Sequence, residues 1–452
     1  MKQAWIQFLP KSLRYKIEGR DNLQIIGNIS WLFAERGLQM SLGLFVSISI
    51  ARYLGPDKFG ILSYALAFSA LMQPLSALGL NAILTRDIVR EPDAKDEILG
   101  TAFILRFLGG LLSYLILISL VWLLHPDDSV ARLLITILSI GNIFRAFGVI
   151  DFWFQSKVLS KYVVISKSLV LCISSAIKLT LIFTQASLNA LIIVLTAEQI
   201  LASICLIVPY HILGNSLINW RFQFSRGKSL LSKSWPLILS SVGTIIYLKI
   251  DQIMLGEMIG KEAVGNYAVA AKISEIWYFI PTAVASSVFP SLLKSRENNI
   301  KAYKNKLQKL YDNLACLALL IALPITIVST PVITMLYGEV FREAGLILSI
   351  HIWASVFIFM RAALSKWLIA EDLYVFSLVT HGLGAIVNAL LNLFLIPNFG
   401  GIGAAIATLI SYATASYFAL FVHSRTVETA RMMTLALIFP VRFLLKKTAK
   451  LS

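Results

Sequence analysis

Nine basic side chains lie inside stretches of sequence that are otherwise long and apolar. They are Arg36, Arg106, Arg145, Lys167, Lys178, Lys249, Lys272, Arg361 and Lys366. A cation at the centre of a lipid bilayer costs at least about 2.5–3.5 kcal/mol, so several of them are not expected to face lipid. Arginine also presents a planar fork of donors that matches the oxygens of a phosphate group. The set therefore predicts a hydrated, net-positive cavity that accepts an anion.

Acidic side chains in the same stretches are fewer and include Glu35, Asp151, Glu198, Asp251 and Glu275. Lys272 and Glu275 are three residues apart and can pair on one helix face, whereas Lys249 and Asp251 point in different directions. Pairing along a helix therefore does not neutralise every cation, and pairing between helices remains the structural alternative. We expect substrate binding by Arg36, Arg106, Arg145, Lys249, Lys272 and Arg361. Glu35, Asp251 and Glu275 are the candidate coupling or ion-pair acids, and Lys167 and Lys366 are close enough to a boundary to reach it.

The elements that position these residues follow from the composition. The chain has 452 residues, of which 58% are hydrophobic and 14% charged, and its mean hydropathy is +0.78. Soluble domains carry about 25% charged residues, so soluble enzymes, nucleic-acid-binding domains and secreted disulfide scaffolds are excluded. Apolar runs longer than about 18 residues indicate membrane-spanning helices rather than β-strands. The fold class is an all-α polytopic membrane protein, and its net charge of +16 is attributed to basic cytoplasmic loops.

Twelve membrane spans can be placed along the chain. They lie near residues 25–50, 61–84, 98–124, 131–153, 162–184, 188–210, 235–258, 265–290, 308–329, 346–369, 373–396 and 401–423. With the N-terminus in the cytoplasm, and with the boundary residues Arg132 and Lys309 counted in the adjacent loops, inner segments hold 26 Lys and Arg residues and outer loops hold 5. This asymmetry predicts that both termini are cytoplasmic. The predicted organisation is a segment 1–20, a six-helix bundle 21–213, a basic linker 214–234, a second bundle 235–423 and a basic interfacial segment 424–452.

An internal repeat supports two equivalent halves. The motif from Gly55 to Gly60, followed by Tyr64, recurs as Gly260 to Gly265, followed by Tyr267. Two prolines within predicted spans, Pro74 and Pro281, also correspond. Six spans in each half give parallel repeats, so we expect two parallel six-helix bundles around a central cavity, as in MATE-like transporters that work by alternating access. The two prolines are candidate hinges, because proline bends a helix.

Nothing in the sequence points to covalent chemistry. The three cysteines, Cys172, Cys205 and Cys316, lie in apolar runs without metal-ligand spacing and are expected to pack. A membrane enzyme such as a polymerase is disfavoured, because no metal pair or nucleophile constellation is present. We therefore predict a transporter without catalytic residues, cofactor, metal or nucleic-acid partner. A multidrug cation antiporter on the same scaffold is the alternative, although it would need a cavity dominated by acids.

Several motifs resemble those of Wzx-type polysaccharide flippases, which belong to the multidrug/oligosaccharidyl-lipid/polysaccharide exporters. They are the segments 31–37, 51–56 and 59–65, the segment 336–341 and the segment 397–405. The resemblance implies translocation of O-antigen-type oligosaccharide repeat units, linked to undecaprenyl pyrophosphate, from the cytoplasmic to the periplasmic leaflet of the bacterial inner membrane. It also implies membrane lipids, a polysaccharide polymerase and chain-length machinery as partners.

The resemblance extends to two site residues. Arg36 and Lys272 occupy positions that are cationic in the related lipid II flippases, although the second is a lysine here and has Glu275 nearby. Lipid II flippases typically have fourteen spans, so the twelve spans predicted here favour an oligosaccharide-lipid substrate.

Overall fold

The structure is a computed structural model that describes residues 20–439 and residue 442, and in this part of the chain every regular element is helical. Within these described residues, ten helical stretches are long and apolar enough to cross a membrane. Two of them are kinked at a residue with non-helical backbone angles, Gly55 in α2 (Arg20–Leu71) and Gly400 in α17 (Tyr374–Ser416). Each kink divides its helix in two, which accounts for the twelve predicted spans. The predicted all-α polytopic fold is confirmed, whereas the predicted segment 1–20 lies almost wholly outside the described residues.

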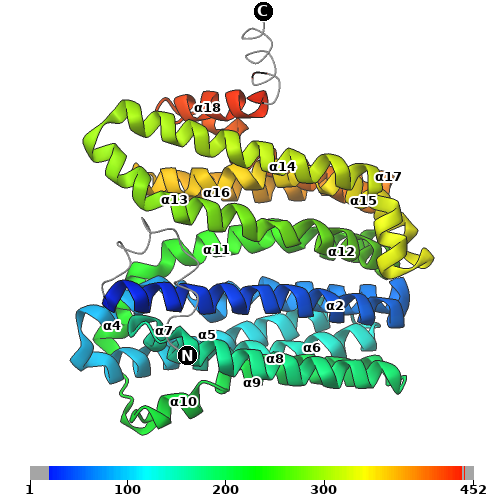
Figure 1. Cartoon of the computed structure of the whole chain (residues 1–452). Helices are drawn as coiled ribbons and strands as arrows, with labels where there is room; N and C mark the ends of the chain where they lie inside the picture. Colours follow the sequence, from blue (N-terminus) through cyan, green and yellow to red (C-terminus); the bar gives the residue numbers. More distant parts are fainter. Residues whose placement is uncertain (1–19, 440–441, 443–452) are drawn as a thin grey trace, which may run out of the picture. The chain divides into compact units, whose positions relative to one another are not determined.

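The chain forms two compact units, which are described separately. The first contains α2 up to Ser47, residues 75–124 and residues 136–235. Its helices are drawn from blue to green in Figure 1. After α2 they are α4 (Asn81–Arg90), η2 (Pro92–Ala94), α5 (Lys95–Leu124), the end of α6 (Ser129–Phe144), η3 (Arg145–Gly148), α7 (Val149–Ser156), α8 (Ser160–Phe183), α9 (Leu188–Ile204), α10 (Ile207–Ile212), η4 (Leu217–Asn219) and the start of α11 (Phe224–Met258).

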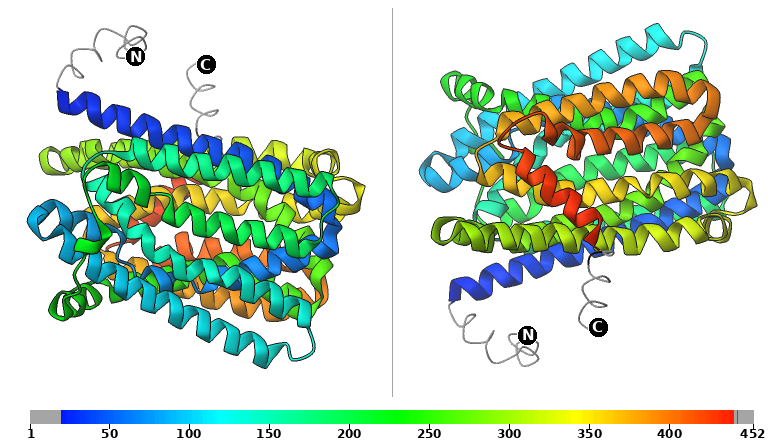
Figure 2. Two further views of the ribbon diagram at one scale, coloured as in Figure 1. Left: turned by 90° about the horizontal axis from the view of Figure 1, so that it is seen from below. Right: turned by 90° about the horizontal axis from the view of Figure 1, so that it is seen from above.

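The second unit contains residues 48–74 and 125–135 and the chain from Pro236 onward. Its elements after α11 are α12 (Lys261–Glu275), η5 (Ile276–Tyr278), α13 (Phe279–Asn298), α14 (Ile300–Tyr337), η6 (Glu339–Phe341), α15 (Arg342–His351), α16 (Ala354–Ala370), α17, η7 (Phe418–Phe421) and α18 (Val427–Leu437). A buried apolar cluster that includes Tyr311, Phe359 and Met433 joins α14, α16 and α18. Figure 2 shows α18 running obliquely to α14. The predicted domain boundaries stay predictions.

Both predicted hinge prolines stand in the first turn of a helix. Pro74 is the second residue of α3 (Gln73–Ala77), which begins after α2 ends at Leu71. Pro281 is the third residue of α13, which follows the 3-10 turn at the end of α12. Proline lacks a backbone N–H and fits the first helical turn, where that donor has no partner. The two prolines therefore mark equivalent helix breaks, and hinge motion at these breaks remains a prediction.

The two copies of the repeated motif contact each other inside the second unit. A Cβ atom at Gly60 would lie 1.7 Å from the carbonyl oxygen of Lys261, and a Cβ atom at Gly265 would lie 2.0 Å from that of Pro56. Pro56 and Lys261 are themselves equivalent positions of the repeat, so the contact is reciprocal. The first glycine of each motif has positive φ, 70° at Gly55 and 132° at Gly260, a conformation that glycine adopts readily. The repeated glycines thus turn the chain and let α2 and α12 approach at backbone distance.

Four polar side chains surround this contact. The Tyr64 hydroxyl lies 2.7 Å from Nε2 of His125 and also donates a hydrogen bond to the carboxylate of Glu257. His125 Nε2 is 3.2 Å from that carboxylate, and the ammonium of Lys261 lies 3.2 Å from the centre of the Tyr64 ring. Tyr64 is fully buried, so these contacts supply partners for a polar group removed from solvent. They connect α2, α11, α12 and the segment that precedes α6.

The linker that precedes α11 is fastened to the start of α5. The backbone N–H of Arg221 donates to the carbonyl of Asp96, and a Cβ atom at Gly100 would lie 2.6 Å from the Arg221 nitrogen. Arg226 pairs with Glu91, at 2.8 Å, and with Glu97. The hydrogen bond from Arg226 lowers the pKa of the Glu91 carboxyl. The basic linker is therefore an ordered segment that packs against the start of α5 within the first unit.

Candidate functional site

Two of the predicted site arginines, Arg106 and Arg145, lie near each other in the first unit and form no salt bridge within the described residues. Arg106 of α5 is buried, and its Nε and Nη1 atoms have no hydrogen-bond partner in the described part of the chain. Arg145, the first residue of η3, likewise has a buried and unpartnered Nε. The guanidinium of Arg106 packs against Gly148 and lies 5.7 Å from the ring centre of Phe152. Unpaired buried charge is costly, so this pair has the donor capacity and the charge to receive an anion.

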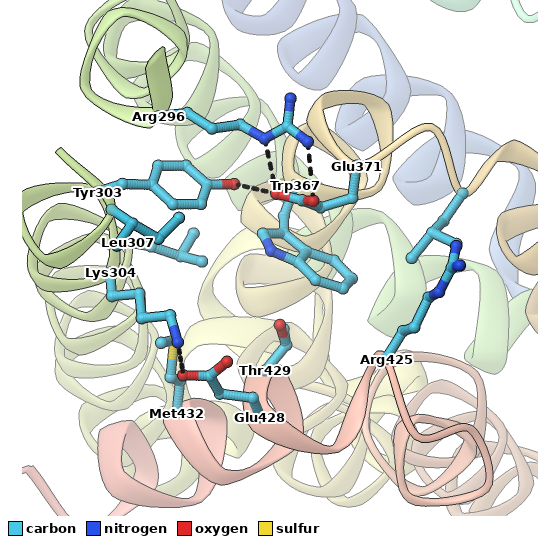
Figure 3. A pocket seen from close by; sticks show the side chains of 12 residues that line it. Arg296, Tyr303, Lys304, Leu307, Trp367, Glu371, Arg425, Glu428, Thr429 and Met432 are labelled. Atoms are coloured by element: carbon cyan, nitrogen blue, oxygen red, sulfur yellow. Dashed lines mark hydrogen bonds and ion pairs between the residues drawn. The ribbon is translucent and has the colours of Figure 1, made fainter. Parts of the chain in front are cut away.

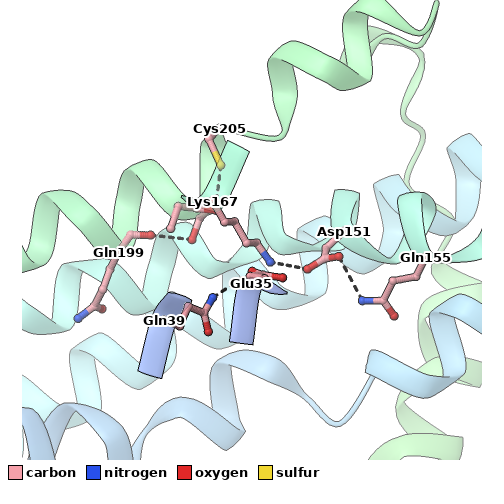
Figure 4. A network of polar contacts seen from close by, with 9 residues as sticks. Glu35, Gln39, Asp151, Gln155, Lys167, Gln199 and Cys205 are labelled. Carbon is pink, nitrogen blue, oxygen red and sulfur yellow. Dashed lines mark hydrogen bonds and ion pairs between the residues drawn. The ribbon is translucent and has the colours of Figure 1, made fainter. Parts of the chain in front are cut away.

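A network of polar groups lies elsewhere in the first unit (Figure 4). The Lys167 ammonium of α8 pairs with the Asp151 carboxylate of α7 at 2.5 Å, and Gln155 donates to the same carboxylate at 3.1 Å. Glu35 accepts a hydrogen bond from Gln39 at 3.0 Å. Lys167, which the sequence analysis expects to lie near a membrane boundary, forms an ion pair between helices. Glu35 is half-buried in this network, whereas Arg36 is exposed and has no ion pair among the described residues.

A second cation of the first unit is also neutralised between helices. Lys178 of α8 is buried and pairs with Glu198 of α9 at 2.6 Å. Pairing between helices, the structural alternative to a binding site, therefore accounts for Lys167 and Lys178. It does not account for Arg106 or Arg145 in the part of the chain that the structure describes.

The second unit holds the other three predicted binding cations in two different environments. Lys249 of α11 is half-buried and Lys272 of α12 is exposed, and neither forms a salt bridge among the described residues, even though Glu275 is three residues from Lys272. Arg361 of α16 is buried and donates to neutral oxygens of α17, at 2.9 Å to Thr380 Oγ1 and 2.9 Å to the Ala415 carbonyl. Arg361 thus joins α16 to α17, while the two lysines keep free ammonium groups.

Asp251 lies at the centre of a buried polar network in the second unit. Its side chain is only 1% exposed and accepts hydrogen bonds from Tyr267, Thr408 and Asn392 at 2.6, 2.5 and 2.6 Å. All three donors are neutral, and no salt bridge reaches Asp251 within the described residues. The Asp251 carboxylate therefore depends on these neutral hydrogen-bond donors, and removing one of them would leave a buried charge less well compensated. Asn392 and Thr408 were missed by the sequence analysis, although polar residues inside apolar runs were the available signal.

An aromatic pocket lies beside the arginine pair. It has a volume of about 320 Å³ and is lined by Gly100, Phe103, Ile104, Phe147, Leu217, Trp220 and Phe222. Phe103 stands one helical turn before Arg106, and its ring centre lies 4.9 Å from that of Phe147, which is adjacent to Gly148. The indole N–H of Trp220 donates to Tyr210. The lining is therefore apolar, and it suits hydrocarbon better than the hydroxyl groups of a sugar.

The described residues show no group of three or more His, Cys, Asp or Glu side chains that could hold a metal ion. The first unit provides unpartnered guanidinium nitrogens and an apolar pocket, which can bind an amphiphilic anion. The second unit separately provides a buried carboxylate that accepts hydrogen bonds from neutral donors. These groups suit noncovalent binding, which is the chemistry of a transporter rather than of covalent catalysis.

Comparison with known proteins agrees with this class. Residues 49–345 match the family of polysaccharide biosynthesis proteins; because the match covers more than half of the chain, the protein belongs to this family. The solved structure of the lipid II flippase MurJ in its inward closed conformation is similar, with a TM-score of 0.69 and 17% identity, over 93% of this chain and 92% of that chain. That likeness establishes the shared fold.

Two curated relatives are similar in sequence. A probable flippase of Haloferax volcanii, AglR, is 30% identical over 57% of this chain and 54% of its own length. A putative O-antigen transporter of Escherichia coli K12 is 24% identical over 60% of this chain and 66% of its own length. The chain thus spans about half the length of the first relative and somewhat more of the second.

Proposed function

We propose that this protein is a flippase for lipid-linked oligosaccharides. In this proposal it moves undecaprenyl-pyrophosphate-linked repeat units from the cytoplasmic to the periplasmic leaflet of a bacterial inner membrane, by alternating access, for the assembly of surface polysaccharide such as O-antigen. Both termini lie in the cytoplasm, as the charge distribution predicts. Family membership and the flippase-named relatives support the substrate class. The polysaccharide polymerase and chain-length machinery are proposed partners.

The observation that carries this proposal is that Arg106 and Arg145 have buried guanidinium nitrogens without a hydrogen-bond partner among the described residues. Two guanidinium groups that form no salt bridge in that part of the chain match the charge and the donor geometry of a pyrophosphate. Arg36, Lys249 and Lys272 add free cations without an ion pair among the described residues. The apolar pocket beside Arg106 would receive the isoprene units nearest to the pyrophosphate. A cationic drug would meet repulsion from the same groups, which disfavours the antiporter.

Two sources of energy could drive export of an anionic head group in this proposal, namely the membrane potential and the coupled movement of a proton or small cation. An inside-negative membrane potential contributes about 2.3 kcal/mol for each elementary charge moved outward across 100 mV, and a pyrophosphate head group carries such charge. Asp251 is our proposed coupling acid, because its buried carboxylate has only neutral donors around it. Glu35 and Glu275 are less enclosed and serve in this proposal as ion-pair or secondary coupling groups.

Deletion and complementation test the proposal. A strain without the gene should accumulate lipid-linked repeat units in the cytoplasmic leaflet, and the wild-type gene should clear them. Arg106→Ala with Arg145→Ala should fail to clear them, whereas Arg106→Lys should restore part of the activity because it retains the charge. Protein levels in the membrane are measured alongside, so that loss of folding is recognised.

A matched control is available in the same unit. Lys178→Met with Glu198→Gln removes a buried cation together with its own acid, and we expect this variant to clear the lipid intermediates as the wild type does. Equal loss of activity in the control and in the arginine variant would contradict a specific role for the arginine pair. Normal surface polysaccharide in the deletion strain, together with altered tolerance to cationic drugs, would favour the antiporter.

A further inference from the structure

A cavity of about 490 Å³ lies at one end of the helices of the second unit (Figure 3). It is enclosed by the end of α13, the start of α14, the end of α16 and the amphipathic helix α18. Because these are helix ends, the cavity lies at the depth of a membrane–water interface if the helices span the bilayer. Its lining residues are Arg296, Ile300, Tyr303, Lys304, Leu307, Trp367, Glu371, Leu373, Arg425, Glu428, Thr429 and Met432.

The charges around this cavity leave one cation without a partner. Arg296 binds Glu371 through two hydrogen bonds of 3.0 Å, and Lys304 pairs with Glu428 at 2.5 Å. Arg425 lies across the cavity from Lys304 (Figure 3), and its guanidinium has no acidic partner among the described residues. The lining therefore has a net charge of one positive unit. This matches the single negative charge of a phosphodiester better than the greater charge of a pyrophosphate.

A second cavity, of about 400 Å³, lies along the same helices and has an entirely apolar set of lining side chains. It is bounded by Leu319 of α14, Val356 of α16 and Leu437 of α18, among others. Val356 precedes Trp367 of the charged cavity by eleven residues, which is three helical turns, so both residues face the same side of α16 about 16 Å apart. Half the hydrocarbon thickness of a bilayer is about 15 Å. The two cavities are thus spaced as the head group and the inner acyl region of one lipid.

We propose that these two cavities bind one anionic bilayer phospholipid. Its phosphodiester binds Arg425 in the charged cavity, and an acyl chain enters the apolar cavity along α14 and α16. The lipid then fastens α18 to the helix ends of the second unit. This site is independent of the proposed transport function, because none of its residues belongs to the predicted substrate site.

Lipid binding to the purified full-length protein tests this site. Native mass spectrometry would measure dioleoyl-phosphatidylglycerol binding to the delipidated protein. Loss of a charge-assisted hydrogen bond predicts that Arg425→Ala weakens binding about tenfold or more. Arg425→Lys should bind with intermediate affinity. Arg431→Ala should bind as the wild type does, because Arg431 is exposed on α18, which follows the turn that holds Arg425, and does not line the cavity.

The contribution of the apolar cavity to lipid binding is tested with a separate variant. Ile410→Trp places a bulky ring at the half-exposed wall of the apolar cavity and should weaken binding of the dioleoyl lipid while leaving dihexanoyl-phosphatidylglycerol unaffected. Equal binding by Arg425→Ala and Arg431→Ala would overturn the proposal. So would equal competition by inorganic phosphate, which would indicate a free-phosphate site, or tighter binding of geranylgeranyl pyrophosphate, which would indicate a carrier-lipid site.

Discussion

The close approach of α2 and α12 can be tested by adding one methyl group at a time. Gly60→Ala and Gly265→Ala would place a Cβ atom 1.7 Å and 2.0 Å from backbone carbonyl oxygens, against 3.4 Å for ordinary contact. The obstructing atoms belong to the main chain and cannot rotate away, so the helices must separate by more than 1 Å. Overpacking of this kind typically costs about 1–3 kcal/mol. We expect each variant to destabilise this contact by that amount. The equilibrium ratio of closed to open contact should then fall by a factor of about five to 150.

A control substitution exists in the same helix. Gly43 also lies in α2, but a Cβ atom there would meet nothing within 4 Å, and its φ is not positive. Gly43→Ala should therefore be neutral or slightly stabilising, because alanine is favoured over glycine in a helix by about 0.5–1 kcal/mol. Comparing the three variants separates the effect of the contact from the general effect of replacing a glycine.

Thiol labelling measures opening of the contact directly. Val264 of α12 is fully buried, and Val264→Cys in a background without Cys172, Cys205 and Cys316 gives a single reporter. In membrane vesicles the reporter should react slowly with a maleimide in the otherwise unchanged protein and in Gly43→Ala. It should react faster in Gly60→Ala and in Gly265→Ala. Equal labelling rates and equal melting temperatures in all three glycine variants would refute the close approach.

Two further predictions concern charged contacts of the first unit. Lys178→Met alone leaves the half-buried Glu198 carboxylate without its partner and should destabilise the protein by about 1–3 kcal/mol, whereas Lys178→Met with Glu198→Gln should restore much of the loss; equal melting temperatures would show that the pair does not contribute to stability. Arg226 lowers the pKa of Glu91, so their contact stabilises the linker above the usual pKa of that carboxyl and is lost as the pH falls through the lowered value. Arg226→Ala should therefore speed chymotrypsin cleavage near Trp220 at neutral pH, while pepsin in strong acid should cleave variant and wild type alike.

Composition predicts the spans well because membrane insertion depends on length and apolarity, which the sequence states directly. The same length criterion counts two pairs of spans as one stretch each, although the chain turns at Gly55 and at Gly400 and each turn separates two helices. The repeat could be predicted from the spacing of the glycines and the tyrosines. The contact between its two copies could not be predicted, because sequence spacing does not determine which surfaces of two distant helices meet.

The candidate site shows where sequence reasoning ends. Unpaired cations could be predicted from the excess of basic over acidic residues in the spans. Which cations find a partner depends on helix rotation, and the Lys167–Asp151 and Lys178–Glu198 pairs join neighbouring helices at separations of 16 and 20 residues. The donors to Asp251 lie as far as 157 residues away. Periodicity along one helix carries no information about such contacts.

The repeat-related tyrosines connect the buried acid to the contact between α2 and α12. Tyr64 donates to Glu257 and Tyr267 donates to Asp251, and both acids belong to α11. A change of charge at Asp251 therefore acts on α12 through Tyr267, on the same helix that carries Gly265. Asp251→Asn removes the negative charge while keeping the shape of the side chain. We therefore expect it to weaken the hydrogen bond from Tyr267 and with it the contact between α11 and α12.

The measurable consequence is an increase in the labelling rate of the Val264→Cys reporter. Asn388→Ala is a suitable comparison, because Asn388 belongs to the same buried network but bonds Asn392 at 3.2 Å and makes no hydrogen bond to Asp251 in the structure. If Asp251→Asn and Asn388→Ala label at the same rate as the unchanged protein, Asp251 does not act on this contact. A faster rate in Asp251→Asn alone would show that the charge of this one carboxylate controls the approach of the two repeats.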